Sequence, residues 1–526
     1  MIRCGPELRR CSVLRNVLLA WLACGVLLGG QQAHAAKTSR RPNAPALTGW
    51  WETRHGDFHI VSKLSRAETT QIARDLQIYR AALRGFFPSS DIEPHVPVTI
   101  LLLDRKLWRQ HFGAEQGRAG VAYPADDHFY VAVNGDLWLE ASSIVFHELT
   151  HVFMHKNTSG GNVPIWFDEG YADLLSTIEK GKDHVKVGLY PKWRLYSLTQ
   201  EPWLPLPTLL SVSRTSPEYR SEKFAPAFYA QSWLLVHYYV FGGEPRHSQI
   251  KKYLSLVGAN EAPERAFAAA FPGDNGEFEL ELQRYKQQKW LKYLRLSVPQ
   301  IEGTAQSEVT ALPAAAANEA VATWMLRHAR LDDAKMQFLE EQAQDAAPTS
   351  VASLQLALAH LRKQQFYLAK PRLDAGCVEP LTVVRQALLC GDAYVWLADS
   401  KLDSEEDHDT EAGGILLARR FFIAALQIEP DNVEALTRAA YTFRSLGGDT
   451  RQLHEALEKS LQRDPNNPAL AVALATVLQH SDVTKTKYYL ERALANASDH
   501  DRAQHLIKWL RMVDEWIAAE KTRPSG

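Results

Sequence analysis

The sequence feature that most constrains this chain is the pentad His-Glu-Leu-Thr-His at residues 147–151. Residues four positions apart lie on one face of an α-helix, so His147 and His151 would point their imidazoles at the same place. Zinc binds such nitrogens at about 2.0–2.1 Å, and a catalytic zinc takes a third protein ligand and a water. Glu148 lies beside the first histidine, where it can accept a proton from that water. The pentad therefore predicts a helix that supplies two zinc ligands and a general base.

An acidic segment follows at a distance that suits a third ligand. Residues 164–175 read Pro-Ile-Trp-Phe-Asp-Glu-Gly-Tyr-Ala-Asp-Leu-Leu, and Glu169 within them is the expected ligand. The 17 residues between His151 and Glu169 allow one helix to end, a turn at 160–162, and a second helix alongside the first. Asp168 is the alternative ligand. Adjacent helical residues are turned by about 100°, so only one of the two carboxylates can face the metal.

These two segments resemble the gluzincin metallopeptidases. The pentad is that of thermolysin-like enzymes, and residues 166–172 match the Trp-x-x-Glu-Gly-aromatic-Ala helix of zinc aminopeptidases, which favours Glu169 over Asp168. Asp173, four residues after Glu169, would accept the free ring N–H of a zinc-bound histidine and fix its tautomer. The resemblance covers residues 50–290, with specific motifs only between 139 and 240. It implies one zinc ion and the hydrolysis of peptide bonds.

A zinc peptidase also needs a donor for the oxyanion of its tetrahedral intermediate. Zinc aminopeptidases take a tyrosine from a helix downstream of the third ligand, and Tyr229 occupies a comparable place without the Lys-Gly pair of that family. Tyr229 as a core aromatic is the alternative. His237 would be the thermolysin-like substitute, but between Val236 and Tyr238 it is expected to be a buried core histidine. The aminopeptidase stretch that holds the free amine of the substrate is missing, which favours endopeptidase action.

The segment before the pentad predicts a small sheet. Apolar runs at 58–62, 98–103, 120–123 and 129–133 indicate strands, and residues 66–86 have helical periodicity. Gluzincins likewise place a small sheet ahead of the zinc helix, and its edge strand pairs with the substrate backbone. Helices are expected at 224–240, 245–257, 261–270 and 275–295. The candidate substrate-binding edge comprises Phe129, Tyr130, Val131, Ala132, Val133 and Asn134.

The last third of the chain contains an internal repeat. Residues 422–436 are similar to residues 457–470, and Pro430 and Pro465 lie 35 positions apart, close to the tetratricopeptide period of about 34. This part resembles a tetratricopeptide (TPR) array, which would bind substrate or a protein partner. An unrelated helical bundle is the alternative. Because such units bury their apolar faces against their neighbours, the array is expected to fold separately from the rest.

The N-terminus has the pattern of an export signal. Arginines precede an apolar stretch at 17–28 that is too short to span a bilayer comfortably, and Ala33-His-Ala35 is a cleavage site. Cleavage would leave no stable membrane span and a periplasmic or secreted bacterial protein. A retained anchor is the alternative. Of five cysteines, cleavage would leave Cys377 and Cys390, either as a disulfide or as two buried thiols. A net charge of −2 with no long basic run gives no indication of nucleic-acid binding.

The predicted fold class is an α+β zincin-like catalytic domain with a small mixed sheet, followed by an all-α TPR-like superhelical domain. The expected function is that of an exported zinc peptidase. Alternatives are a TPR-based binding scaffold with an inert or structural zinc domain, and a zinc hydrolase of non-peptide amides such as those of cell walls. A structural zinc normally has four protein ligands, whereas this site offers three and a base. The predicted segments are a signal peptide at 1–35, a spacer at 36–48, the catalytic domain at 49–297, a linker at 298–313 and the repeats at 314–520.

Overall fold

The computed structural model describes most of the chain beyond the predicted leader. The predicted signal peptide and spacer lie outside the described residues, as does the turn expected at 160–162. The described ranges are 49–87, 92–94, 96–111, 120–124, 128–135, 138–157, 163–181, 184–213, 216–221, 223–259, 261–273, 276–288, 291–297, 308–328, 330–400, 408–496 and 500–522. Among these residues, no helix combines the length and the apolar composition that crossing a bilayer requires.

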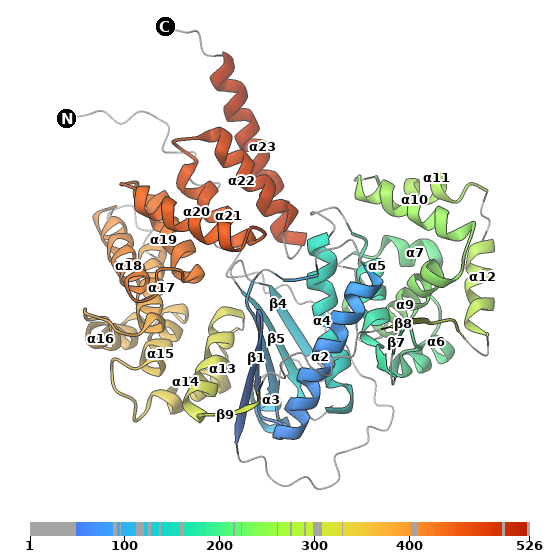
Figure 1. Cartoon of the computed structure of the whole chain (residues 1–526), viewed down its shortest axis with the longest axis horizontal. Coiled ribbons are helices and arrows are strands. Elements are labelled where there is room, and N and C mark those ends of the chain that lie inside the picture. Colours follow the sequence, from blue (N-terminus) through green and yellow to red (C-terminus); the bar gives the residue numbers. More distant parts are fainter. Residues whose placement is uncertain are drawn as a thin grey trace.

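A mixed six-stranded sheet lies at the centre of the molecule (Figure 1). Its strand order is β4-β5-β3-β2-β1-β9; β3 runs parallel to β2 and β5, and the other pairs are antiparallel. Every residue of β3 is buried, so helices cover both faces of the sheet. The strands are β1 (Trp50–His55), β2 (Phe58–Ser62), β3 (Val98–Leu103), β4 (Gly120–Pro124), β5 (Phe129–Asn134) and β9 (Thr310–Leu312).

The prediction that residues 129–134 form the edge of the sheet is wrong. Strand β5 pairs with β3 on one side, from Val98↔Phe129 to Leu103↔Asn134, and with β4 on the other. Its main chain is therefore engaged along both sides, and β4 is the outer strand at this end of the described sheet. The two strands form one hairpin, and alternating apolar residues do not reveal which arm of a hairpin lies outside.

One face of the sheet shares a core with four helices, among them the two that carry the pentad and the acidic segment. These are α2 (Arg66–Phe86), α4 (Trp138–Asn157), α5 (Ile165–Ser176) and α9 (Ala225–Phe241), and together they bury one continuous core. Tyr79 of α2 fixes α4, because its ring stacks on Phe146 at 4.6 Å and its hydroxyl lies 2.8 Å from the Thr150 hydroxyl. The remaining elements here are α3 (Arg105–His111), β6 (Glu179–Lys180), β7 (His184–Val187), η4 (Lys192–Arg194), α6 (Leu195–Gln200), α7 (Leu206–Ser211), α8 (Pro217–Arg220), α10 (Arg246–Gly258), α11 (Pro263–Ala270), α12 (Glu277–Lys286) and β8 (Leu294–Ser297).

The helix expected at 275–295 is shorter than its sequence pattern suggests. Helix α12 ends at Lys286, and β8 then pairs antiparallel with β7, from Val187↔Leu294 to His184↔Ser297. Pairing with a strand about 110 residues earlier in the chain decides the conformation of 294–297, which local periodicity cannot detect.

The opposite face of the sheet packs against the first repeat helices. Alternation along β3 directs Ile100 to the face with α4, and Leu101 to a second core that contains Trp324 of α13 (Ala314–His328) and Leu339 of α14 (Asp333–Ala343). Tyr123 of β4 meets the Trp324 ring edge-on at 5.3 Å. In addition, β9 lies inside the stretch predicted as a linker and pairs with β1. Sheet and repeats therefore share a core across the boundary at 298–313.

The C-terminal region is a helical repeat array that begins beside the sheet and bends round, so that α21 and α23 lie above the sheet in the view of Figure 1. Helices that follow one another in sequence pack as antiparallel neighbours, and the apolar positions of α17 to α23 form a further core. The helices are α13 (Ala314–His328), α14 (Asp333–Ala343), α15 (Val351–Arg362), α16 (Phe366–Gly376), α17 (Val384–Ser400), α18 (His408–Ile428), α19 (Val433–Leu446), α20 (Arg451–Arg463), α21 (Pro468–Leu478), α22 (Val483–Ala495) and α23 (His500–Thr522).

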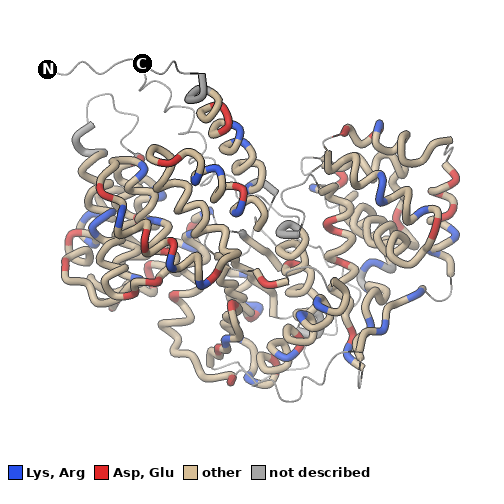
Figure 2. The backbone as a smooth tube through the Cα atoms, turned by 45° about the horizontal axis from the view of Figure 1, so that its top comes forward, with Lys and Arg blue, Asp and Glu red and all other residues tan. Residues whose placement is uncertain are grey.

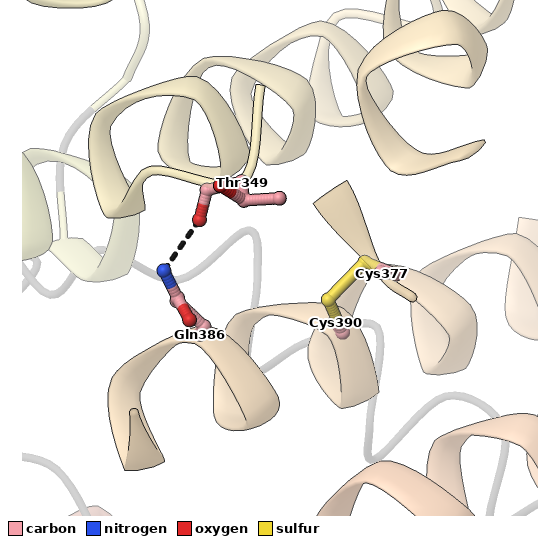
Figure 3. The surroundings of a disulfide bond; sticks show 4 residues. All are labelled: Thr349, Cys377, Gln386 and Cys390. Carbon is pink, nitrogen blue, oxygen red and sulfur yellow. Dashed lines mark hydrogen bonds between the residues drawn. A yellow bond between two sulfur atoms is a disulfide. The ribbon is translucent and has the colours of Figure 1, made fainter. Parts of the chain in front are cut away.

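A disulfide and an ionic cluster tie the repeat helices together. Cys377, just after α16, is bonded to Cys390 of α17 (Figure 3). Beside it, the Gln386 side chain donates to the Thr349 carbonyl. Figure 2 shows basic and acidic residues interspersed along the helices of the array.

The ionic cluster centres on Glu434 of α19. Arg327 of α13, Arg385 of α17 and Arg438 of α19 all donate to Glu434 Oε1. Burial alone would raise the pKa of Glu434, but the three guanidinium groups outweigh it and hold that pKa well below its usual range. The Arg327 guanidinium also lies 5.7 Å from the Tyr130 ring of β5, so this cluster reaches from the array to the sheet.

Replacing Trp324 by alanine tests the shared core. The substitution lies in the repeats, yet it removes a fully buried ring that packs against the sheet, so we expect it to cost about 3–5 kcal/mol of unfolding free energy. Denaturant unfolding followed by circular dichroism measures the loss. Trp516→Ala on α23, where the side chain is 37% exposed, is the control and should change stability by less than about 0.5 kcal/mol. An equally small effect of Trp324→Ala would show that the two parts fold independently.

Candidate metal centre

Three side chains from two helices converge on one point. The Nε2 atoms of His147 and His151 on α4 lie 3.2 Å apart. Glu169 Oε2 on α5 lies 3.3 Å from the first of these atoms and 3.6 Å from the second. All three side chains are buried. In the part of the chain that the structure describes, they form the one group of three or more His, Cys, Asp and Glu side chains close enough to hold a metal ion.

The spacing of these three atoms fits zinc. An ion about 2.0–2.1 Å from each of its tetrahedral ligands requires ligand atoms roughly 3.3–3.4 Å apart. The observed separations of 3.2, 3.3 and 3.6 Å bracket that value. Glu169 Oε2 is also buried without a hydrogen-bond partner among the described residues, a costly state for a carboxylate oxygen unless a cation meets it. The donor set therefore suits one zinc ion.

The packing of α5 explains the glycine that follows Glu169. Helix α5 crosses α9 so closely that a Cβ on Gly170 would lie 2.4 Å from the Ser232 carbonyl oxygen. Only glycine allows this approach, and the approach brings Glu169 up to the two histidines of α4. The Glu-Gly pair thus combines a ligand with the packing that places it.

His147 is oriented through its second ring nitrogen. Its Nδ1 lies 3.1 Å from Asp173 Oδ1. Arg194 in turn donates to both oxygens of Asp173, from Nε at 2.6 Å and from Nη2 at 3.2 Å. Burial raises the pKa of Asp173, but Arg194 and His147 outweigh it and hold that pKa below its usual range, so the carboxylate is ionised. Asp173 therefore lies where the sequence places it, and Arg194 is a partner that no motif reveals.

His151 is oriented by the residue that the sequence offers as a rival ligand. Asp168 Oδ1 lies 3.0 Å from His151 Nδ1, on the far side of the ring from Glu169. Each of the two imidazoles has a second ring nitrogen that needs an acceptor. Asp173 can serve as the acceptor for only one of the two histidines, so the need for a second acceptor is the signal in the sequence that points to Asp168.

The carboxylate of Glu169 has a partner of its own. Tyr219 of α8 donates its hydroxyl to Glu169 Oε1 at 3.0 Å. Tyr229 lies next to it, with ring centroids 6.0 Å apart, and the Arg194 guanidinium covers the Tyr229 ring at 4.6 Å. Burial first, and then the Glu169 charge, raise the pKa of Tyr229 well above its usual value. The role of Tyr229 as an oxyanion donor stays a prediction, and sequence reasoning missed Tyr219 altogether.

Two further residues singled out from the sequence, Glu148 and His237, are both buried. Glu148 lies in α4 between the two histidines and is 6% exposed. His237 is a buried core histidine, as expected, with Nδ1 2.9 Å from the Tyr285 hydroxyl and Nε2 near two backbone carbonyls. The outer strand β4 passes close to α4, because a Cβ on Gly120 of β4 would lie 2.5 Å from Ile144 Cγ2 of α4.

Comparisons with known proteins leave the site to be interpreted from its own geometry. No family model matches the chain, and no curated protein sequence matches it. Among solved structures, it is similar to a thermophilic TPR protein of Thermus thermophilus. The match has 17% sequence identity and a TM-score of 0.29, and it covers 38% of this chain and 98% of that one.

Glu169 and its neighbour Asp168 should differ in how strongly they affect zinc binding. Glu169→Ala removes a ligand and should abolish stoichiometric zinc binding. Asp168→Ala removes only the acceptor for His151 and should weaken zinc binding by about 10–100-fold. Competition with a chromophoric chelator measures both, and Glu179→Ala on the exposed strand β6 is the control. Wild-type affinity in Asp168→Ala would mean that its 3.0 Å contact does not orient His151.

Gly170→Ala tests the close approach of α5 and α9. The added methyl group would meet the Ser232 backbone, so we expect α5 to shift at a cost of about 1–3 kcal/mol, together with weaker zinc binding. The matched control is Gly258→Ala at the end of α10, where a Cβ meets nothing within 4 Å. It should be neutral or stabilise by up to about 1 kcal/mol. Thermal unfolding measures the stability of both variants. Equal stability of Gly170→Ala and Gly258→Ala would show that α5 tolerates a side chain at position 170.

Proposed function

We propose that this protein is a zinc-dependent hydrolase of peptide bonds that acts as an endopeptidase. The observation that carries the proposal is the set of three buried ligand atoms 3.2–3.6 Å apart, with a glutamate next to the first histidine in the same helix. Three protein ligands leave one position of a tetrahedral zinc open, as catalytic sites do. A structural zinc would normally use a fourth side chain.

The residues around the site have distinct roles in this proposal. When bound, zinc would lower the pKa of a water molecule and polarise the carbonyl of the scissile bond. Glu148 accepts the proton of the attacking water and delivers it to the leaving nitrogen. Its burial keeps this transfer away from bulk solvent. Tyr229 is the candidate donor to the oxyanion, and Asp173 and Asp168 keep the two imidazoles in the tautomer that binds metal through Nε2.

The sheet offers a place for an extended substrate. Strand β4 has its outer side unpaired among the described strands and lies against the metal helix, so we assign to it the role first expected of β5. A peptide added alongside β4 would bond through its backbone, which suits an enzyme that accepts internal segments of a chain. The absence of an amine-holding motif supports the same preference.

The remaining parts of the proposal concern partner and compartment. Helical repeat arrays bind other proteins along extended surfaces, so we assign recruitment of substrate or a protein partner to the TPR-like region. The Cys377–Cys390 disulfide supports an oxidising compartment, in line with the signal peptide that the sequence predicts at residues 1–35. We therefore place the protein in the periplasm or outside the cell.

Replacing Glu148 by glutamine tests the proposal. The ligands stay intact, so the variant should bind zinc like the wild type, while hydrolysis should fall to background because no base activates the water. The measurements are zinc content and turnover of unfolded casein, with cell-wall fragments as a second substrate. Glu179→Gln is the control. Wild-type turnover by Glu148→Gln would contradict the metallohydrolase mechanism, and turnover of cell-wall fragments alone would replace peptides by non-peptide amides as the substrate.

A further inference from the structure

The two carboxylate oxygens of Glu169 have different surroundings. Oε2 faces the imidazole nitrogens and has no hydrogen-bond partner among the described residues. Oε1 accepts the hydroxyl proton of Tyr219 at 3.0 Å. Both side chains are at most 3% exposed, so water does not compete for this bond.

The segment that carries Tyr219 contributes little else to the interior. Helix α8 has four residues, and Tyr219 is the buried one: Pro217 and Arg220 are exposed and Glu218 is half-buried. The Tyr219 ring packs edge-on against Phe228 of α9 at 5.9 Å. An otherwise exposed turn of helix thus places one phenol against a metal ligand, and the packing fixes where its hydroxyl points.

A second phenol lies behind the first. Tyr229 is buried, and its ring packs beside the Tyr219 ring with centroids 6.0 Å apart. The Tyr219 ring thus packs against both Phe228 and Tyr229, and its hydroxyl proton goes to Glu169. Arg194 covers the Tyr229 ring and also holds Asp173, so one guanidinium supports both the Glu169 and the His147 side of the site.

We propose that Tyr219, oriented by Tyr229, is a positioning residue that restricts Glu169 to a single metal-binding oxygen. The inference rests on the zinc site of the proposed function. A carboxylate can bind a metal through one oxygen or through both, and the second oxygen would occupy the position that a catalytic site keeps for water and substrate. A hydrogen bond to a charged oxygen is among the stronger ones, and here it engages Oε1 while Oε2 faces the two histidines. Tyr219 thereby keeps the fourth position open.

The experiment compares phenylalanine variants of the cobalt-substituted protein. Cobalt(II) has visible bands that weaken and shift when a four-coordinate site becomes five-coordinate, and this readout does not depend on turnover. In Tyr219→Phe, Glu169 is free to bind through both oxygens, so we expect the bands to weaken and kcat to fall by about 10–100-fold. Tyr229→Phe keeps the ring that packs against Tyr219, so it should leave the spectrum unchanged. Tyr285→Phe, which removes a hydroxyl bonded to the core histidine His237 and to none of the three candidate ligands, should leave spectrum and kcat unchanged.

The outcomes separate this inference from the proposed function. A wild-type cobalt spectrum in Tyr219→Phe overturns the inference, whether or not the native protein hydrolyses peptides. A loss of kcat in Tyr229→Phe with unchanged spectra in both variants also overturns it and favours Tyr229 as the oxyanion donor. A weakened spectrum in Tyr219→Phe supports the inference even if no substrate is turned over. Failure of the wild type to bind cobalt or zinc removes the metal site and the inference together.

Discussion

Helix α5 buries three carboxylates within one and a half turns, and the residues around the site compensate the cost of removing these charges from water. Asp168, Glu169 and Asp173 are each at most 4% exposed. Moving such a charge out of water costs several kcal/mol unless cations and donors meet it. Each carboxylate has its own compensation: Asp173 has Arg194 and His147, Asp168 has His151, and Glu169 has Tyr219 on one oxygen and the proposed ion on the other. The ligands, their acceptors and the supporting arginine form one interdependent electrostatic unit.

The rest of the fold holds the two helices of that unit in register. Tyr79 ties α4 to α2, and Gly170 brings α5 onto α9. The sheet beneath α4 is supported from its other face by Trp324 and its neighbours in the repeats. The cluster around Glu434 adds a polar connection, because Arg327 meets both that carboxylate and the face of Tyr130. The array is thus one side of the sheet's second core, in addition to the recruiting surface that we propose it to be.

The sequence alone predicts those parts of the molecule that depend on local spacing. The i, i+4 pair on α4, the choice of Glu169 over Asp168 at the metal position, the place of Asp173, the buried His237 and most strands and helices follow from periodicity or from short motifs. Tertiary geometry decides the rest. The two arms of a hairpin have equivalent patterns, so the sequence does not show that β4 rather than β5 is the outer strand. Strand β8 depends on its pairing with β7, and β9 falls in a stretch with linker composition. Arg194 and Tyr219 reach the site from the short helices η4 and α8, 21 and 50 residues beyond the residues they contact, and no sequence motif indicates them.

The core shared by sheet and repeats has a consequence for how such a chain can evolve. A premature stop codon after β9 would leave every candidate metal ligand encoded, yet it would strip the second face of the sheet and expose Trp108, Val121, Tyr123 and Tyr130. The two parts are therefore not modules that recombination can exchange freely. A lineage that lost the repeats would need a new apolar cover for β3, β4 and β5, so selection on the site is also selection on residues of α13 that lie on the other side of the sheet.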